Sequence, residues 1–198
     1  MGKTPLIRVR AAAAAEVCEH VDLNGRARAL LGDYMGPREF VDTLMVNKEF
    51  VAGIDFLAHA LPPREAIWWG CLCLQYAYRD RLLPVEKDAA RAAVQWVLQP
   101  TEEYRAAAKA PAAAAGVANP AGELARAVNM TGGSLAPPQL PCVPPDLFAP
   151  ARSAAMAIKL SCAQAEPLRI VDTQRLYLLL GIGIAEGNYL WSFAQGGA

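Results

Sequence analysis

Only two residues of this 198-residue chain are histidines, and one of them is spaced for acid–base chemistry. His59 follows Asp55 by four residues, which places both side chains on one face of a helix, where a carboxylate can orient an imidazole as a general base. This face is the polar side of its predicted helix, and the chain contains no GxSxG elbow to present a nucleophilic serine. A solvated Asp–His pair is therefore the simpler interpretation.

Glu39 and Glu65 form a second candidate, because paired carboxylates can divide the roles of general acid and general base. Each of them stands in the first turn of a predicted helix, where the helix dipole favours a carboxylate in any protein. We therefore assign no catalytic residue. A small hydrolase-like enzyme that uses Asp55 and His59, or Glu39 and Glu65, is kept as the alternative function.

Two glycine-rich stretches invite a cofactor interpretation. In "GIGIAEG", residues 181–187, the third glycine falls at 187, whereas the dinucleotide fingerprint requires it at 186, and only eleven residues follow. That is too short for a βαβ unit. "TGGS", residues 131–134, lacks the lysine and the spacing of a phosphate-binding loop and is more typical of a helix stop. We predict no cofactor.

The cysteines indicate neither a metal site nor a disulfide framework. They are odd in number and scattered, at positions 18, 71, 73, 142 and 162. Cys71 and Cys73 are two residues apart, which on a helix separates them by roughly 200° around the axis, too far for one ion. No CxxC or HExxH motif exists. We predict five reduced and mostly packed thiols, and no metal.

The helix predicted from the double proline at 62–63 to Arg79 is the most distinctive element, and it presents three different lines. Small side chains form a ridge that lets a neighbouring helix approach closely: Ala66, Gly70, Cys73 and Ala77. A second buried line holds Ile67, Cys71, Leu74 and Tyr78. We expect this helix to be the most buried element of the fold.

The third line of this helix is mixed and is the candidate partner-binding site: Arg64, Trp68, Leu72, Gln75 and Arg79. Two large apolar groups among polar ones are typical of a binding hot spot, where Trp and Arg are enriched. The ordinary alternative is that the proline-rich segment or the C-terminal helices cover them. Whether Trp68 is exposed or covered therefore decides between a binding surface and ordinary packing.

Helical periodicity continues through almost the whole chain, so we predict an all-α fold, a compact array of antiparallel helical hairpins. A single domain, 1–198, would comprise an N-terminal arm or short strand (1–10), a helical array (11–130), a proline-rich strap (131–147) and a C-terminal helix pair (148–190). Predicted helices cover 11–21, 23–31, 37–46, 50–61, 63–79, 84–98, a stretch from Thr101 that Pro111 damages, 120–131, 148–162 and 167–189. The last would bury Leu176, Leu179, Leu180 and Ile184.

Five prolines make the strap extended, at positions 137, 138, 141, 144 and 145. Apolar residues alternate with them, namely Leu135, Leu140, Val143 and Leu147. We expect these residues to hold the strap against the domain.

Charge and hydropathy exclude several classes of partner. Nineteen basic residues balance nineteen acidic ones, which disfavours a nucleic-acid role. Arg8 and Arg10 interrupt the first apolar run, unlike a signal peptide, and "LYLLLGIGIA" is too short to span a bilayer. We expect a cytoplasmic protein without membrane insertion.

Three stretches together resemble a family of uncharacterised bacterial proteins: the segment from "REFVDTLMV" to "CLCLQYA", then "NPAGELARAV", then "GGSLAPPQLPCVPP". Members of that family tend to be encoded among type VI secretion components. The resemblance implies an accessory or adaptor role and assigns no catalytic residue. We therefore expect a non-enzymatic, chaperone-like adaptor that binds a protein of a type VI-like secretion system.

Overall fold

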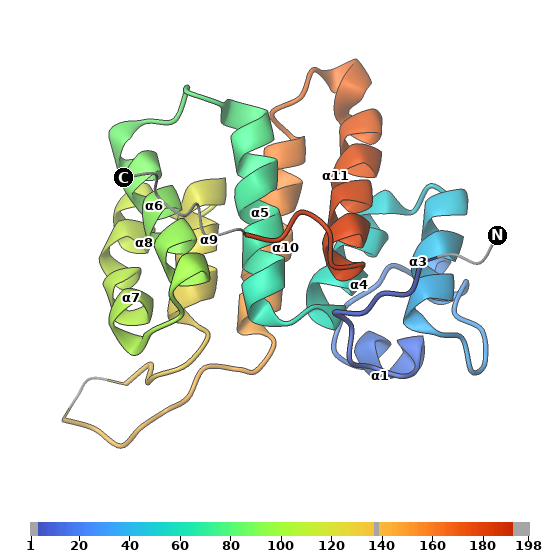
Figure 1. Ribbon diagram of the computed structural model, residues 1–198, viewed down its shortest axis with the longest axis horizontal. Helices are drawn as coiled ribbons and strands as arrows, with labels where there is room; N and C mark the ends of the chain where they lie inside the picture. Colours follow the sequence, from blue (N-terminus) through green and yellow to red (C-terminus); the bar gives the residue numbers. More distant parts are fainter. Residues whose placement is uncertain (1–3, 137–138, 192–198) are drawn as a thin grey trace, which may run out of the picture.

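The computed structural model describes residues 4–136 and 139–191, and every regular element in these ranges is a helix (Figure 1). The all-α prediction is confirmed. Residues 4–10 run without regular structure, so the N-terminal segment forms no strand there. Within the described ranges, no helix combines the length and hydrophobicity that crossing a membrane requires.

The helices begin largely where the sequence signals them. Four of them start at a proline, whose fixed φ and missing N–H suit the first helical position. The elements are α1 (Ala14–Cys18), α2 (Gly25–Arg28), α3 (Pro37–Val46), α4 (Phe50–Ala60), α5 (Pro63–Tyr78), α6 (Pro84–Leu98), α7 (Glu102–Ala107), α8 (Lys109–Ala115), α9 (Pro120–Asn129), α10 (Ala149–Cys162), the 3-10 turn η1 (Pro167–Arg169) and α11 (Ile170–Ala185).

Three helices differ in length from the prediction. The first two are single turns, shorter than the predicted 11–21 and 23–31. The helix that starts after Thr101 is interrupted at Ala108, as the prediction that Pro111 damages it requires, and Pro111 itself stands in the first turn of α8, where a missing N–H costs nothing. The last helix stops at Ala185 rather than near Tyr189, because Gly187 adopts a left-handed φ of 92°.

Helices α5 and α10 lie side by side at the centre of the molecule (Figure 1). On one side of this pair lie α6, α8 and α9, and on the other lie α4 and α11, with α3 packed on α4. Sequence neighbours pack together, as α8 does on α9 and α9 on α10, but α10 packs just as extensively on α5, from which four helices separate it in the chain. Consecutive hairpins therefore do not build this fold by themselves.

The small-residue ridge of α5 faces neighbouring helices, as predicted. A Cβ atom added to Gly70 would collide with the side chain of Leu124 on α9 and would lie 3.8 Å from Ile158 on α10. Ala66 and Cys73, on the same ridge, are fully buried. The absence of a side chain at Gly70 therefore sets how closely α9 and α10 approach α5.

Trp69, which the predicted lines of α5 left unassigned, joins the central pair to α11. Its side chain is completely buried, and its Nε1–H donates a hydrogen bond of 2.8 Å to the carbonyl oxygen of Tyr177. A Cβ atom on Gly181 would overlap the indole ring. The first glycine of "GIGIAEG" is thus explained by packing, since it makes room for a tryptophan.

The expectation that α5 is the most buried helix is wrong. Eight of its sixteen residues are buried, against eight of ten in α9. The reason is geometric: α5 contacts helices on most of its circumference, but its mixed line remains at the surface. Helix α9 is short and lies between α6, α8 and α10.

The proline-rich segment does not lie on the helices. It extends from one end of the molecule (Figure 1), and its apolar side chains at 135, 140, 143 and 147 are all more than half exposed. The predicted packing of these residues is therefore wrong. A hydrogen bond of 2.8 Å from Leu135 N–H to the Val143 carbonyl links the two ends of the loop to each other. Helix α10, rather than the loop, packs against both α5 and α9.

Replacing Gly70 by leucine is expected to destabilise the fold by about 1–3 kcal/mol, because the new side chain must displace Leu124 and Ile158 from a closed interface. Chemical denaturation followed by circular dichroism measures the loss. Gly25→Leu is the matched control, since a Cβ atom there meets nothing within 4 Å. Equal stability of the two variants would contradict the packing described for the ridge.

Candidate functional site

The mixed line of α5 lies between α6 and α11. Arg64, Trp68 and Leu72 are half-buried, whereas Gln75 and Arg79 are exposed. Arg64, Trp68, Leu72 and Gln75 occupy successive turns of α5, whose other sides are packed, whereas Arg79 caps its C-terminal end with a φ of 50°. Their side chains therefore lie together on the one side of α5 that no other helix covers.

A depression of about 270 Å³ lies between α5 and α6 and is mostly apolar. Leu82, between the two helices, contributes to its wall, and most of the predicted line of α5 takes part. Its lining residues are Trp68, Cys71, Leu72, Leu74, Gln75, Arg79, Leu82, Ala90 and Val94. This depression could accept one medium-sized apolar side chain of a partner.

A second depression, of about 370 Å³, lies on the other side of the same line, between α5 and α11. It is lined by Leu72, Tyr76, Leu176, Tyr177, Leu179, Leu180 and Tyr189. The two depressions meet at Leu72, which lines both. We call the surface formed by these two sets of residues the α5 face.

Helix α11 contributes exposed apolar residues that the sequence analysis assigned to the core. Leu176 is 55% exposed and Leu179 is 42% exposed, and Leu180 is half-buried, whereas Ile184 is fully buried as predicted. Tyr76, on α5, is also exposed and was missed. The available signal was that α11 carries apolar residues on nearly all its sides, more than one buried stripe needs.

The residues after α11 partly cover Trp68. Its Nε1–H donates a hydrogen bond of 2.7 Å to the carbonyl oxygen of Tyr189, and its ring meets that of Trp191 edge to face at 6.5 Å. The C-terminal segment crosses α5 at this point (Figure 1). The cover of Trp68 therefore comes from Tyr189, at the end of the predicted C-terminal helix pair (148–190), and from Trp191 just after it.

Asp55 and His59 do not form the predicted side-chain pair. The Asp55 carboxylate accepts a hydrogen bond of 2.7 Å from Lys159 Nζ on α10, while His59 Nδ1 lies 2.7 Å from the backbone oxygen of Asp55. Both side chains are half-buried, so the interpretation as a solvated pair is also wrong. The face of α4 that carries Asp55 and His59 was predicted to be polar and solvated, but helix α10 packs against it.

The ring of His59 is held in an environment that disfavours its charge. Its buried Nε2 atom finds no hydrogen-bond partner among the described residues, and Phe148 stacks against the rings of both His59 and His20. Burial lowers the pKa of His59, and the nearby Arg152 and Lys159 lower it further, against the Asp55 carbonyl and charge. The imidazole therefore acts as a packed, neutral group.

The two candidate glutamates have different surroundings. Glu65 is buried in the first turn of α5, with its Oε1 atom 3.7 Å from Arg8 Nη1. Glu39 is exposed on α3, beside Asp42 and Thr43, where it lines a separate depression of about 460 Å³. The described contacts do not join them into an acid–base pair.

Four of the five cysteines are buried, and only Cys142, on the proline-rich loop, is exposed. Burial raises the pKa of Cys71 and of Cys162 to about 12, and that of Cys73 well above its ordinary value. Within residues 4–136 and 139–191, no group of three His, Cys, Asp or Glu side chains is placed to hold a metal ion. The buried thiols are thus packing groups.

Comparison with known proteins gives one result. A family model described as a family of unknown function (DUF6931) matches residues 40–185, from within α3 to the end of α11. Neither a curated protein nor a solved structure matches the chain. The matched range contains nearly the whole α5 face but not Tyr189, which follows α11.

Lowering the pH is expected to destabilise the protein in part through His59. Its pKa is lowered in the folded state, so below about pH 6.5 the unfolded chain binds the proton more readily. The free energy of unfolding then decreases as the pH falls from about 6.5 toward the lowered pKa of His59. Above about pH 6.5, the contribution of His59 to this free energy does not change with pH. His59→Gln should flatten the melting temperature between about pH 5 and 7, and His20→Gln, at the exposed ring, should not. Equal slopes in wild type and His59→Gln would contradict this.

The cysteine environments predict selective thiol labelling. In the native protein, a chromogenic disulfide reagent at neutral pH should titrate one thiol, that of Cys142, because the other four are buried. In denaturant it should titrate five. Cys142→Ser should abolish the fast native reaction; rapid labelling of two or more thiols in the native wild type would show that the core is more open than described.

Proposed function

Since the chain belongs to the DUF6931 family, whose function is unknown, its own surface has to indicate its role, and we propose that it is a non-enzymatic adaptor that binds a partner protein on the α5 face. The observation that carries this proposal is the pair of apolar depressions that meet at Leu72. Exposed apolar surface that is contiguous, rather than scattered, marks interaction sites.

The α5 face has the composition of an interface centre. Its exposed or half-buried members include Trp68, Tyr76 and Tyr189, large aromatic groups of the type that dominate binding energies. Arg79 lies at the edge of the α5–α6 depression, where a polar rim is expected. The two depressions on either side of Leu72 suit a partner segment that inserts two side chains, as an amphipathic helix in a groove does.

The alternative, a small enzyme, has less support in the geometry. Its two candidate pairs would need side chains that converge on a common cavity. Asp55 is bound by Lys159 rather than by the imidazole, and Glu65 lies against Arg8. Each of these carboxylates already has a basic partner that explains its position.

The identity of the partner follows from the resemblance described above rather than from the fold. We propose a component of a type VI-like secretion system in the bacterial cytoplasm.

The test is partner capture by full-length protein carrying a substitution on the α5 face. Leu176→Asp and Tyr76→Ala change exposed side chains, so the melting temperature should hold. The same co-purifying secretion component, identified by mass spectrometry with wild type, should be lost from both variants. Removal of one hot-spot residue costs about 2 kcal/mol or more of binding, roughly 30-fold in Kd.

Val46→Asp is the matched control, because Val46 is an 81% exposed apolar residue on α3, outside the α5 face. It should retain the partner. Capture that is equal in all variants would overturn the proposed site. A turnover activity that His59→Ala or Asp55→Ala abolishes without unfolding the protein would replace the adaptor by the enzyme.

A further inference from the structure

The end of α11 directs the chain back over α5. The N–H of Asn188 donates to the carbonyl of Gly183 at 2.8 Å, and the N–H of Gly187 donates to that of Ile184 at 2.9 Å. With Gly187 at a φ of 92°, these two bonds form a Schellman motif, which reverses the direction of the chain. Residues 188–191 thereby reach Trp68 although α11 runs beside α5.

Within this segment, Tyr189 packs its ring on α11. Its ring lies against Gly183, where a Cβ atom would collide with it, and the second glycine of "GIGIAEG" is thus explained as the first was. Tyr189 also has a φ of 55°, in the left-handed region that a bulky residue adopts only under constraint. Its side chain nevertheless remains 64% exposed.

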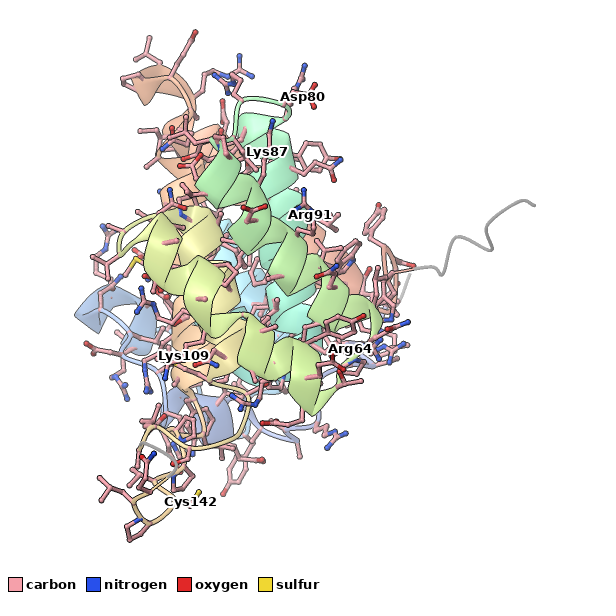
Figure 2. The ribbon with its side chains drawn as sticks, turned by 90° about the vertical axis from the view of Figure 1, so that its left-hand side faces the viewer. Arg64, Asp80, Lys87, Arg91, Lys109 and Cys142 are labelled. Carbon is pink, nitrogen blue, oxygen red and sulfur yellow. The ribbon has the colours of Figure 1, made fainter. Side chains whose placement is uncertain are left out.

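Arg64 and Trp68 form a cradle for the ring of Trp191. The guanidinium carbon of Arg64 lies 4.1 Å from the centre of that ring, a cation–π contact, and Trp68 meets its edge. Arg64 is held independently of the segment, since its Nε and Nη2 atoms donate to the carbonyls of Val97 and Leu98 at 2.7 and 3.2 Å. Figure 2 shows Arg64 beside this C-terminal end of α6, far from Lys87 at the other end.

The position of Arg64 in the cradle therefore does not depend on a ring lying against it. The carbonyls at the end of α6 have no helical partner, and Arg64 satisfies them while its planar face remains available. The indole N–H of Trp68 needs an acceptor, which an extended backbone provides in the form of a carbonyl. The site thus recognises a backbone oxygen and an aromatic ring two residues beyond it, as in Tyr189 and Trp191.

We propose that the Arg64–Trp68 cradle is a recognition subsite for an extended protein segment that carries an aromatic side chain, and that residues 189–191 are its built-in occupant. This inference rests on the proposed function, and it adds the chemistry of the partner and a means of regulation. A partner segment displaces the chain's own residues and takes over the hydrogen bond to Trp68 and the ring position under Arg64.

The contacts of the built-in occupant are few enough for a partner to replace. Its described residues contact Arg64 and Trp68 through one hydrogen bond, one edge contact and one cation–π contact, Leu190 and Trp191 are only partly buried against the core, and Tyr189 bears an unfavourable φ. Its advantage is its tether, which gives it a high effective concentration at the cradle. A partner overcomes that advantage if it also fills the depressions on either side of Leu72, which the segment leaves open.

The test uses the full chain with Trp191→Ala, which empties the aromatic position and leaves Tyr189 in place. The probe is a fluorescently labelled, N-acetylated peptide of residues 186–191, and its binding is measured by anisotropy. Wild type should bind the peptide at least about tenfold more weakly than Trp191→Ala, because its own Trp191 occupies the cradle. A peptide that carries alanine in place of its tryptophan should not bind either protein.

Arg64→Gln in the Trp191→Ala background provides the control on the cradle, and thermal melting verifies that this variant is folded. It should reduce peptide binding at least about tenfold. Equal affinity of wild type and Trp191→Ala, no binding by folded Trp191→Ala, or no effect of Arg64→Gln would each overturn the inference.

The same experiment separates this inference from the proposed function. If the peptide behaves as expected but partner capture is insensitive to Leu176→Asp, the cradle stands and the adaptor function fails. If capture depends on Leu176 but the peptide does not bind, the adaptor stands and the cradle inference is wrong.

Discussion

The arrangement of the other helices depends on how closely they pack against α5. On one side, the missing side chain of Gly70 lets Leu124 of α9 and Ile158 of α10 approach the helix axis. On the other, Gly181 of α11 makes room for the indole of Trp69, whose N–H is satisfied by the Tyr177 carbonyl. Close approach of this kind increases the number of van der Waals contacts and leaves no alternative position for the neighbouring helices.

The surface of the protein follows from that constraint. Helices α6, α9, α10 and α11 all pack on α5, and between α6 and α11 the remaining line of α5 is left near solvent, with Trp68 and Leu72 half-buried. The two depressions lie along its edges, one between α5 and α6 and the other between α5 and α11. The candidate interface is thus a consequence of the packing rather than an addition to it.

The same packing explains why the residues that first suggest chemistry do not perform it in the expected way. Lys159 on α10 takes the carboxylate of Asp55, and Phe148 covers the ring of His59. An imidazole in such a place loses its charge more easily than in water, since desolvation penalises the protonated form. Helical spacing brought the two residues to one face, but a neighbouring helix decided what they contact.

Local patterns in the sequence determined the helical class, the proline-initiated starts of α3, α5, α6 and α9, and the three lines of α5, because these depend on residues a few positions apart. Tertiary structure decided the rest: which line each neighbour covers, that Leu176 on α11 is exposed while Trp69 is buried, and that residues 189–191 return to Trp68. The described residues of the proline-rich loop show the same division, since their lack of helix was predictable but their position was not. Contacts between α5 and helices a hundred residues away are selected by the shape and volume of whole surfaces, which no local periodicity encodes.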